Sequence, residues 1–297
     1  MTTTALQFGL AVPPTAAPGA DPVADAQAAE RLGYDFVTTS DHPCGTSPSY
    51  ETWTMLSWIA AATSTIRVGS RVLGIPYRNP ALLAKMAETF QRLSGGRLIL
   101  GLGGGYSDDE FRAFGMPVPT PGEKITGMAD AIAIARGLWT QPSFSYAGRS
   151  YHTAGASIEP KPDQPIPIWL GTFGPRALRV TGELADGWIP TLGFMPDKEV
   201  DDMRARVLRA NEAAGRDPGR FTCALHLQVA VGADGSGDQT KSDSGELKGS
   251  ADAVATRLAD LVGRGFTTFS IVPSGPDRAE QVERIAREVL PAVRSAV

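Results

Sequence analysis

The chain has 297 residues, of which 42% are hydrophobic and 20% charged, and its formal net charge is −4. These values are ordinary for a globular protein, and they argue against nucleic acid or an anionic membrane as a partner. With only two cysteines, Cys44 and Cys223, and three histidines, a disulfide framework or a cysteine- or histidine-rich metal centre is not expected. The opening residues lack a secretory signal and no apolar run approaches the ~18 residues that span a bilayer, so a cytoplasmic protein is expected.

Short apolar stretches alternate with amphipathic segments along the whole chain. The expected strands are residues 6–12, 36–41, 66–73, 97–103, 166–171, 187–191, 222–231 and 267–272. They are almost continuously apolar or β-branched, which is typical of parallel strands buried on both faces. Eight βα units predict an α/β fold with a single (β/α)₈ TIM barrel over residues 1–297 and loop insertions, although a doubly wound open sheet has the same alternation.

The segments between the strands carry helix signals. An Asn-Pro pair opens the helix expected over 80–93, and apolar residues at three- and four-residue steps predict another over 123–139. Gly33 and Gly265 each stand between a helix and a strand, where a left-handed cap favours glycine.

Two segments interrupt the alternation. Residues 141–165 are expected to hold a short hairpin around Tyr146–Tyr151. Residues 232–250 are polar and rich in glycine and serine, so they are expected to form a mobile loop. That loop is either a surface insertion or a lid over the strand ends.

Candidate site residues follow the strands, because the working residues of such barrels lie at the carboxyl ends of the strands. Asp41 and His42 follow the second strand, where such a pair either contacts a polar ring and takes part in proton transfer or simply caps a turn. Glu51 is a further candidate, although a carboxylate favoured by the dipole at a helix start is the simpler interpretation.

Glycine-rich turns follow other strands. Three consecutive glycines after the fourth strand, Gly103, Gly104 and Gly105, either admit a ligand close to the backbone or form a flexible turn. Their spacing fits neither a dinucleotide fingerprint nor a Walker loop. The turn 171–174 enters a helix at Pro175 and is either a phosphate site or a plain capped turn. The turn 69–80 either presents backbone to a flat ring or is only a turn, and its Tyr77 and Arg78 either contact a ligand or lie on the surface.

Together these segments resemble the luciferase-like monooxygenase superfamily, and within it the branch that depends on coenzyme F420, a deazaflavin. The similar blocks are residues 28–43, 50–70, 77–111, 165–188 and 249–271. Their order and spacing carry the resemblance more than any single block. It implies a TIM barrel, an oxidoreductase that transfers hydride between coenzyme F420 and a small organic substrate, and a homodimer. The apolar helix with Trp53, Leu56, Trp58 and Ile59 fits either the dimer interface or the core.

The resemblance also implies site residues. In relatives the Asp-His pair lies beside the deazaflavin ring, so Asp41 and His42 take that place here. His42 is the predicted catalytic residue, which contacts the ring and either stabilises or relays a proton. Residues 71–74 match a turn that in relatives often holds a non-prolyl cis peptide bond against the rear face of the ring. The cofactor-binding set implied in this way is Asp41, His42, Arg71, Val72, Leu73, Gly74, Gly103, Gly104, Gly105, Thr172, Phe173 and Gly174.

The sequence departs from two groups of relatives. Luciferases that use FMN place an arginine in the strand-four loop, where this chain has Gly104, so FMN is less favoured than coenzyme F420. The sugar-phosphate dehydrogenases carry a catalytic glutamate in that loop and a tryptophan after the Asp-His pair, where this chain has Tyr106 and the segment Cys44–Thr46. An FMNH₂-dependent monooxygenase and a non-catalytic flavin-binding barrel stay open as alternatives.

Overall fold

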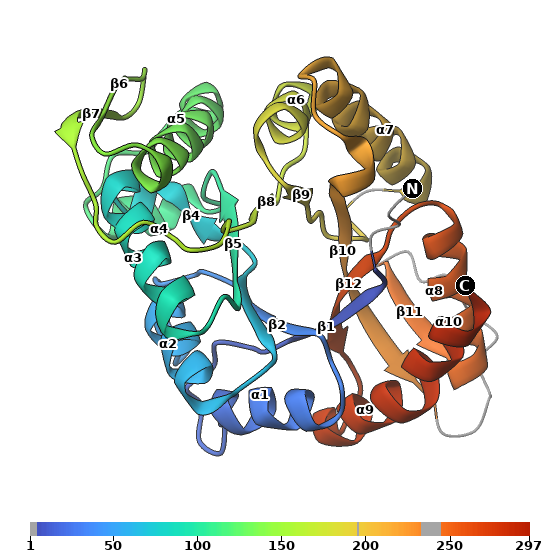
Figure 1. Cartoon of the computed structure of the whole chain (residues 1–297). Helices are drawn as coiled ribbons and strands as arrows, with labels where there is room; N and C mark the ends of the chain where they lie inside the picture. The colour runs from blue at the N-terminus through green and yellow to red at the C-terminus, as the bar shows by residue number, and fades with distance from the viewer. Residues whose placement is uncertain (1–4, 195, 233–244) are drawn as a thin grey trace.

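The computed structural model describes residues 5–194, 196–232 and 245–297, and within them parallel strands close into a barrel surrounded by helices (Figure 1). Of the ten strands in the main sheet, the short strands β4 and β11 lie outside the ring, which leaves eight. The ring closes because β1 pairs with both β12 and β2, while β9 pairs with β10. The predicted TIM barrel is therefore confirmed.

The elements alternate along the chain as predicted. The strands are β1 (Gln7–Ala11), β2 (Phe36–Thr39), β3 (Arg67–Ser70), β4 (Leu73–Gly74), β5 (Leu98–Gly103), β6 (Phe144–Ala147), β7 (His152–Ala156), β8 (Ile168–Leu170), β9 (Gly187–Trp188), β10 (Thr222–Val231), β11 (Glu246–Gly249) and β12 (Thr268–Pro273). The α-helices are α1 (Pro22–Arg31), α2 (Thr52–Ala62), α3 (Pro80–Leu93), α4 (Asp108–Ala113), α5 (Pro121–Thr140), α6 (Pro175–Leu184), α7 (Asp197–Ala213), α8 (Ala251–Gly263), α9 (Arg278–Arg284) and α10 (Leu290–Ala296). Short single-turn helices are η1 (Ile75–Tyr77), η2 (Pro218–Arg220) and η3 (Ile285–Val289).

A small apolar cluster fills the inside of the barrel, and a larger one lies between the strands and the helices. The inner cluster consists of Phe36, Ile99, Trp169, Ile189 and Ala224. The Phe36 ring occupies the space beside Gly9, where a Cβ atom would lie 2.2 Å from a ring carbon. Since side chains alternate along a strand, every second residue from these positions also faces the inside.

Local signals place the helix ends. The Asn79 side chain accepts hydrogen bonds from the first turn of α3, as the sequence predicts. Helix α5 begins at Pro121, two residues before the expected start, because Thr120 and Glu123 form a capping box there. Gly33 and Gly265 have φ angles of 82° and 92°, so both glycine caps are confirmed.

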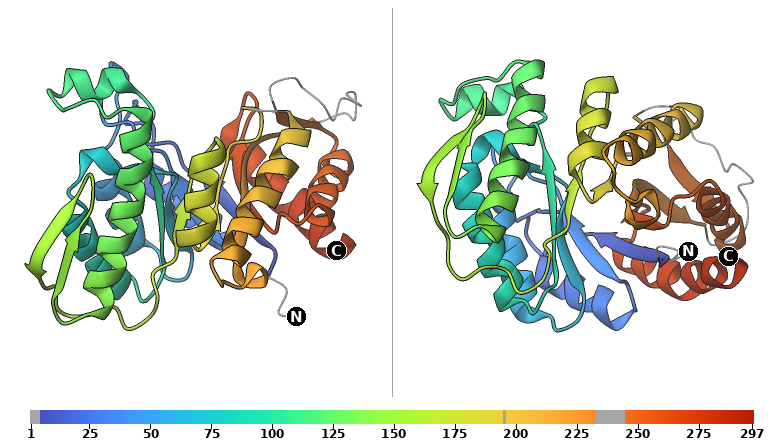
Figure 2. Two further views of the ribbon diagram at one scale, coloured as in Figure 1. Left: turned by 90° about the horizontal axis from the view of Figure 1, so that it is seen from above. Right: turned by 45° about the horizontal axis from the view of Figure 1, so that its top comes forward.

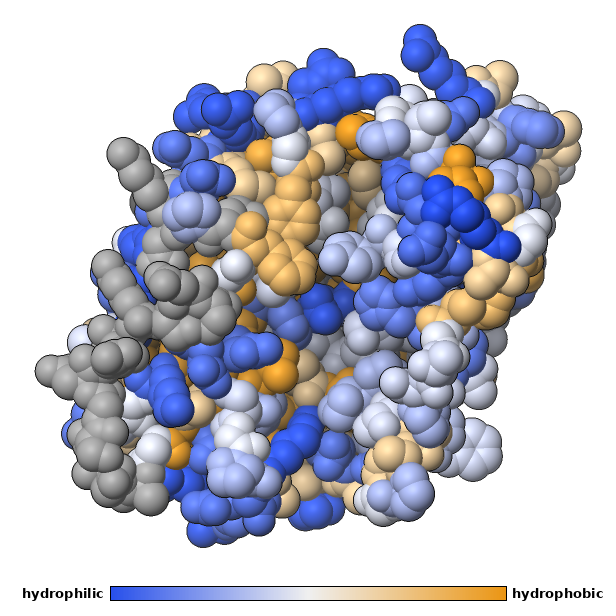
Figure 3. Space-filling model, turned by 180° about the vertical axis from the view of Figure 1, so that it is seen from behind, coloured by the Kyte–Doolittle hydropathy of each residue, from blue (hydrophilic) through white to orange (hydrophobic). Residues whose placement is uncertain are grey.

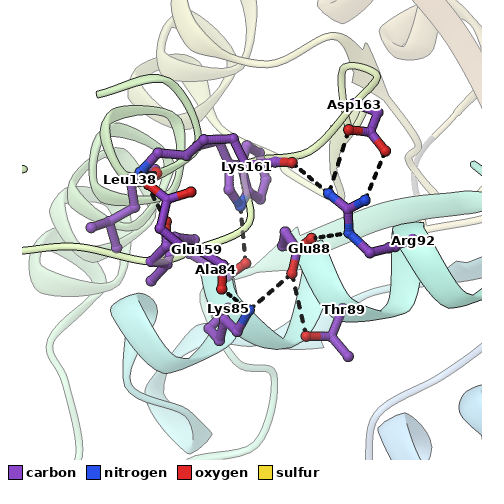
Figure 4. A network of polar contacts seen from close by, with 11 residues as sticks. Ala84, Lys85, Glu88, Thr89, Arg92, Leu138, Glu159, Lys161 and Asp163 are labelled. Carbon is purple, nitrogen blue, oxygen red and sulfur yellow. Dashed lines mark hydrogen bonds and ion pairs between the residues drawn. The ribbon is translucent and has the colours of Figure 1, made fainter. Parts of the chain in front are cut away.

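The predicted hairpin is the antiparallel pair β6–β7, which lies outside α5 (Figure 2). The chain that returns from it is fastened to α3 by a polar network (Figure 4). At its centre the buried Glu88 carboxylate accepts hydrogen bonds from Lys85 and Arg92, at 3.0 and 2.8 Å. Arg92 also donates to Asp163 at 2.9 Å, so the ionic network joins α3 to the segment that leads into β8.

Two predictions about strands and loops need correction. The stretch expected as one strand over 66–73 is divided into β3 and β4, because the backbone turns between them. The end of the segment expected as a loop over 232–250 is strand β11, whose backbone pairs in parallel with β10. The lid interpretation falls on residues 233–244, which lie outside the described residues.

The surface and the helices add two observations. Seen from behind, the molecule is hollowed near its centre, and hydrophilic and hydrophobic residues meet in the hollow (Figure 3). Over the described residues, every helix is too short or too polar to cross a lipid bilayer.

On α2, Leu56 and Ile59 are buried whereas Trp58 is 71% exposed, so this helix packs into the core on one face only.

Glu30 makes the stability of this fold dependent on pH. Its carboxylate accepts hydrogen bonds from the backbone N–H groups of Ser64, Thr65 and Ile66, at 2.9, 2.6 and 3.0 Å. Burial opposes ionisation, but these bonds prevail and lower the pKa from 4.5 to about 2. Because the folded pKa lies below the unfolded one, the stabilisation is complete above the unfolded value and is lost as the pH falls towards 2.

We expect Glu30→Gln to lower the free energy of unfolding by about 2 kcal/mol at pH 7, allowing for partial exposure. The difference from the native chain should shrink by about half at pH 3, as measured by urea unfolding at both pH values. The control Glu283→Gln removes an exposed ion pair with Arg287 and should change stability by less than about 0.5 kcal/mol. Equal losses at pH 7 and pH 3 for Glu30→Gln would contradict this account.

Candidate active site

Asp41 follows β2, and its carboxylate is buried and fully engaged with the protein. The Arg78 guanidinium donates to both carboxylate oxygens, at 2.7 and 3.1 Å, and the Gly74 backbone N–H donates at 2.9 Å. Bidentate pairs of this kind are among the stronger hydrogen bonds in proteins. Asp41 therefore fastens the turn that follows β3 to the end of β2, so it shapes the mouth of the barrel.

Glu51 belongs to the same cluster. It caps α2 by accepting from the N–H groups of Trp53 and Thr54, and Arg78 donates to it at 2.5 Å. Burial opposes ionisation of Glu51, but these hydrogen bonds outweigh it and lower its pKa. The interpretation of Glu51 as a helix-start carboxylate is confirmed.

His42 is the exposed member of the Asp-His pair, and its ring is held from one side. Its Nδ1 atom lies 2.9 Å from a carboxylate oxygen of Glu110, and 47% of the side chain is exposed. Glu110 comes from α4, which follows the glycine-rich loop after β5. When Nδ1 carries the proton, its N–H donates a hydrogen bond to Glu110 and Nε2 is unprotonated, so Nε2 can accept a proton. Nε2 has no hydrogen-bond partner among the described residues.

Tyr77 completes this arrangement. Its hydroxyl donates to the other Glu110 oxygen at 2.7 Å, and its ring lies 4.8 Å from that of Phe111. Burial raises the pKa of Tyr77 and the Glu110 hydrogen bond raises it further, so the hydroxyl stays protonated. Glu110 is thus held between a tyrosine and a histidine. The sequence pattern did not single it out, since its one signal was an acidic residue in the first turn of a short helix.

The turn predicted to contact the ring contains a cis peptide bond, between Arg71 and Val72. The Val72 side chain packs inside the barrel against glycines of β5 and of the turn after β8. A Cβ atom on Gly101, Gly103 or Gly171 would lie 3.3, 2.6 or 3.2 Å from its methyl groups. These glycines therefore make room for Val72. Leu73 and Gly74 form β4 beside β5.

The remaining glycines of the loop after β5 also have packing roles. A Cβ atom on Gly104 would lie 2.9 Å from the Cβ atom of Lys124. Gly105 has a φ of 86°, and a Cβ atom there would lie 2.3 Å from the Phe111 ring. The Lys124 ammonium donates to the Gly105 carbonyl at 3.2 Å. Contact between this loop and a ligand stays a prediction.

The turn Thr172-Phe173-Gly174 lies at the start of α6. The Thr172 hydroxyl is buried, 2.7 Å from that of Thr181, so it is directed towards the helix. Gly174 has a φ of 79° and opens α6 with no capping side chain among the described residues, a helix start of the kind that can bind an anion. Phe173 is 41% exposed, with its ring 6.2 Å from that of Phe194.

A second polar group lies inside the barrel and was not singled out in the sequence. His226 on β10 is buried, and its Nδ1 atom lies 3.0 Å from the Ser270 hydroxyl. Ser270 in turn lies 2.8 Å from the Thr38 hydroxyl. The sequence concealed His226 because the strand around it is almost continuously apolar. Within the described ranges, no group of three or more His, Cys, Asp or Glu side chains is arranged to hold a metal ion.

Known proteins resemble this chain in sequence and in structure. The F420-dependent glucose-6-phosphate dehydrogenase of Kineococcus radiotolerans is 32% identical over 213 residues, which cover 69% of this chain and 62% of that protein. The enzyme of the same name from Intrasporangium calvum is 28% identical over 309 residues, covering 90% of this chain and 92% of its own length.

The structure of an F420-dependent secondary alcohol dehydrogenase in complex with an F420-acetone adduct superposes with a TM-score of 0.87 at 19% identity, covering 98% of this chain and 100% of that one. This likeness shows that the two proteins share a fold. The family model for luciferase-like monooxygenases matches residues 3–236. The chain belongs to the luciferase-like monooxygenase family.

Proposed function

We propose that the protein is a coenzyme F420-dependent oxidoreductase, which transfers hydride between the deazaflavin and a small organic substrate at the mouth of the barrel. The observation that carries the proposal is the His42 ring, which Glu110 holds at Nδ1 while no described residue forms a hydrogen bond with Nε2. The names of the relatives support the choice of cofactor. Gly104, in place of the arginine of FMN-using luciferases, supports it as well.

The residues at the strand ends fit such a cofactor. The Arg71 guanidinium makes no ion pair among the described residues, so the mouth contains an uncompensated positive charge for an anionic or carbonyl-rich ligand. Val72 would support the ring, and the uncapped start of α6 at Gly174 would receive a phosphate. When bound, the cofactor supplies the hydride chemistry, while the protein orients it and sets the local charge.

His42 would accept and return the hydroxyl proton of the substrate. In the oxidation of an alcohol, Nε2 accepts the hydroxyl proton as the carbonyl forms, and in the reverse direction it returns that proton. The Glu110 carboxylate accepts the Nδ1–H bond, fixes the ring and stabilises the positive charge that the imidazole gains. Tyr77 donates to the other oxygen of Glu110 and keeps the carboxylate in place.

The substrate need not be that of the relatives. The sequence lacks the glutamate and tryptophan of sugar-phosphate dehydrogenases at the matching places, Tyr106 and Cys44–Thr46. We therefore propose a small alcohol or carbonyl compound other than a sugar phosphate. A homodimer and a cytoplasmic location stay predictions.

Cofactor titration tests the proposal. We expect purified protein to quench the fluorescence of coenzyme F420 with micromolar affinity and to bind FMN at least about tenfold more weakly. Replacing Gly174 with Asp should weaken binding of coenzyme F420 more than replacing it with Asn, because both side chains strain the backbone at a φ of 79° but only Asp places a negative charge at the proposed phosphate site. Lys85→Met on α3, outside the barrel mouth, serves as the control and should leave binding unchanged. Tight FMN binding without affinity for coenzyme F420 would overturn the proposal in favour of an FMNH₂-dependent monooxygenase.

A further inference from the structure

The Arg71 side chain enters the barrel. Arg71 continues the extended backbone of β3, since its N–H donates to the Thr39 carbonyl at 2.7 Å. Gly69, two residues earlier, faces inwards, because a Cβ atom there would lie 3.1 Å from Ile99 of the inner cluster. Residues two apart on a strand face the same side, so Arg71 points into the mouth from β3.

This guanidinium is largely shielded from water, and none of the described residues provides it with a counter-ion. Burial lowers the pKa of Arg71 to about 10, and no carboxylate among the described residues opposes that effect. Arg78 is different, because Asp41 and Glu51 neutralise it. A buried charge normally has a partner, since transfer of an unpaired ion out of water is costly. The unpaired Arg71 therefore indicates an anionic partner that the chain itself does not supply.

The side chains opposite Arg71 are neutral hydrogen-bonding groups. His226 faces inwards because Ala224, two residues before it on β10, belongs to the inner cluster. Burial, reinforced by the positive charge of Arg71, lowers the pKa of His226 well below its ordinary value, so the imidazole is uncharged. When Ser270 donates to Nδ1, Nε2 carries the proton and donates towards a ligand. The Arg71 cation and the neutral N–H donor of His226 can together bind a negative charge that is shared between nitrogen and oxygen atoms.

We propose that Arg71 and His226 bind the carbonyl-bearing edge of the deazaflavin and stabilise the negative charge which that edge gains on reduction. The inference rests on the proposed function. Hydride from the substrate adds two electrons and one proton to the central ring, while the substrate loses two electrons and its hydroxyl proton passes to Nε2 of His42. The ring thereby gains one negative charge, shared by the pyrimidine nitrogen and its adjacent carbonyl, and no further reactant is needed.

The test compares the affinity for oxidised and reduced coenzyme F420 in the absence of substrate. We expect Arg71→Met to weaken binding of the reduced form at least about tenfold more than that of the oxidised form. This ratio corresponds to a fall of about 30 mV in the midpoint potential of the bound cofactor. Arg71→Lys keeps the charge and should retain most of the preference. The matched control is Arg67→Met, which removes another desolvated arginine from the amino end of the same strand and should leave the ratio unchanged.

The outcomes separate this inference from the proposed function. If the native chain binds neither form, the proposed function fails and this inference fails with it. If the native chain binds both forms and Arg71→Met leaves the ratio of the two affinities unchanged, the assignment of Arg71 to the reduced cofactor is wrong while the proposed function stands. Arg71→Met removes an unpaired charge, so its thermal unfolding midpoint should be no lower than that of the native chain.

Discussion

Replacing His42 with alanine is expected to lower kcat by about 10²- to 10⁴-fold, the range by which a positioned general acid or base accelerates a reaction. The reason is that Nε2 of His42 is the free basic nitrogen beside the cluster formed by Glu110 and Tyr77. The affinity for coenzyme F420 should change by less than about threefold, because an exposed ring contributes little binding energy compared with the charged groups of the site. Stopped-flow reduction of the cofactor, together with fluorescence titration, measures both quantities.

Glu110→Gln tests the role of the carboxylate that holds His42. Glutamine keeps the size of the side chain but removes the negative charge that stabilises the protonated imidazole, so we expect kcat to fall about tenfold with KM almost unchanged. Asp109→Asn is the matched control, because Asp109 is the preceding residue of α4 and its 91% exposed carboxylate pairs only with Arg112 in the described structure. If His42→Ala leaves cofactor reduction and turnover unchanged, His42 does not carry the proton of the substrate. If the native chain binds coenzyme F420 but does not reduce it with the alcohols offered, the protein is a non-catalytic flavin-binding barrel.

The fold was predictable because its signals are local. Buried parallel strands give apolar runs, and Gly33 and Gly265 mark helix ends by their conformational freedom. The division of the third strand was not predictable in this way. It depends on Val72 packing against glycines of β5 and of the turn after β8, which are distant in the sequence. Strand β11 was missed because its polar, glycine-flanked sequence has no apolar run.

The candidate site was predictable only in part, for the same physical reason. Position after a strand indicated Asp41 and His42, but their partners Arg78 and Glu110 stand 37 and 68 residues further along the chain. Such pairs arise when the barrel closes, and no local pattern contains them. His226 was hidden for a different reason, because a strand buried on both faces has no alternation to reveal which residues point inwards.

Asp41→Ala is expected to lower the free energy of unfolding by about 3–5 kcal/mol, because it leaves the buried Arg78 with only the half-exposed Glu51 as a partner. It also frees the Gly74 N–H, so the turn that carries Arg71 and Val72 loses its attachment to β2. Urea unfolding measures the first effect, and weaker binding of coenzyme F420 reports the second.

The double variant Asp41→Ala/Arg78→Met tests whether the loss of stability in Asp41→Ala comes from the unpaired Arg78 guanidinium. If the loss in Asp41→Ala comes mainly from the unpaired guanidinium, removal of that charge should restore about half of the stability, and the two substitutions will be strongly non-additive. The turn would still lack its carboxylate anchor, so cofactor binding should stay weak in the double variant. Asp163→Asn, which breaks an exposed pair with Arg92, should cost less than about 1 kcal/mol. If Asp41→Ala lowers the free energy of unfolding by no more than Asp163→Asn does, the buried ion pair contributes no more than a surface ion pair. Asp41 then does not hold the mouth of the barrel in shape.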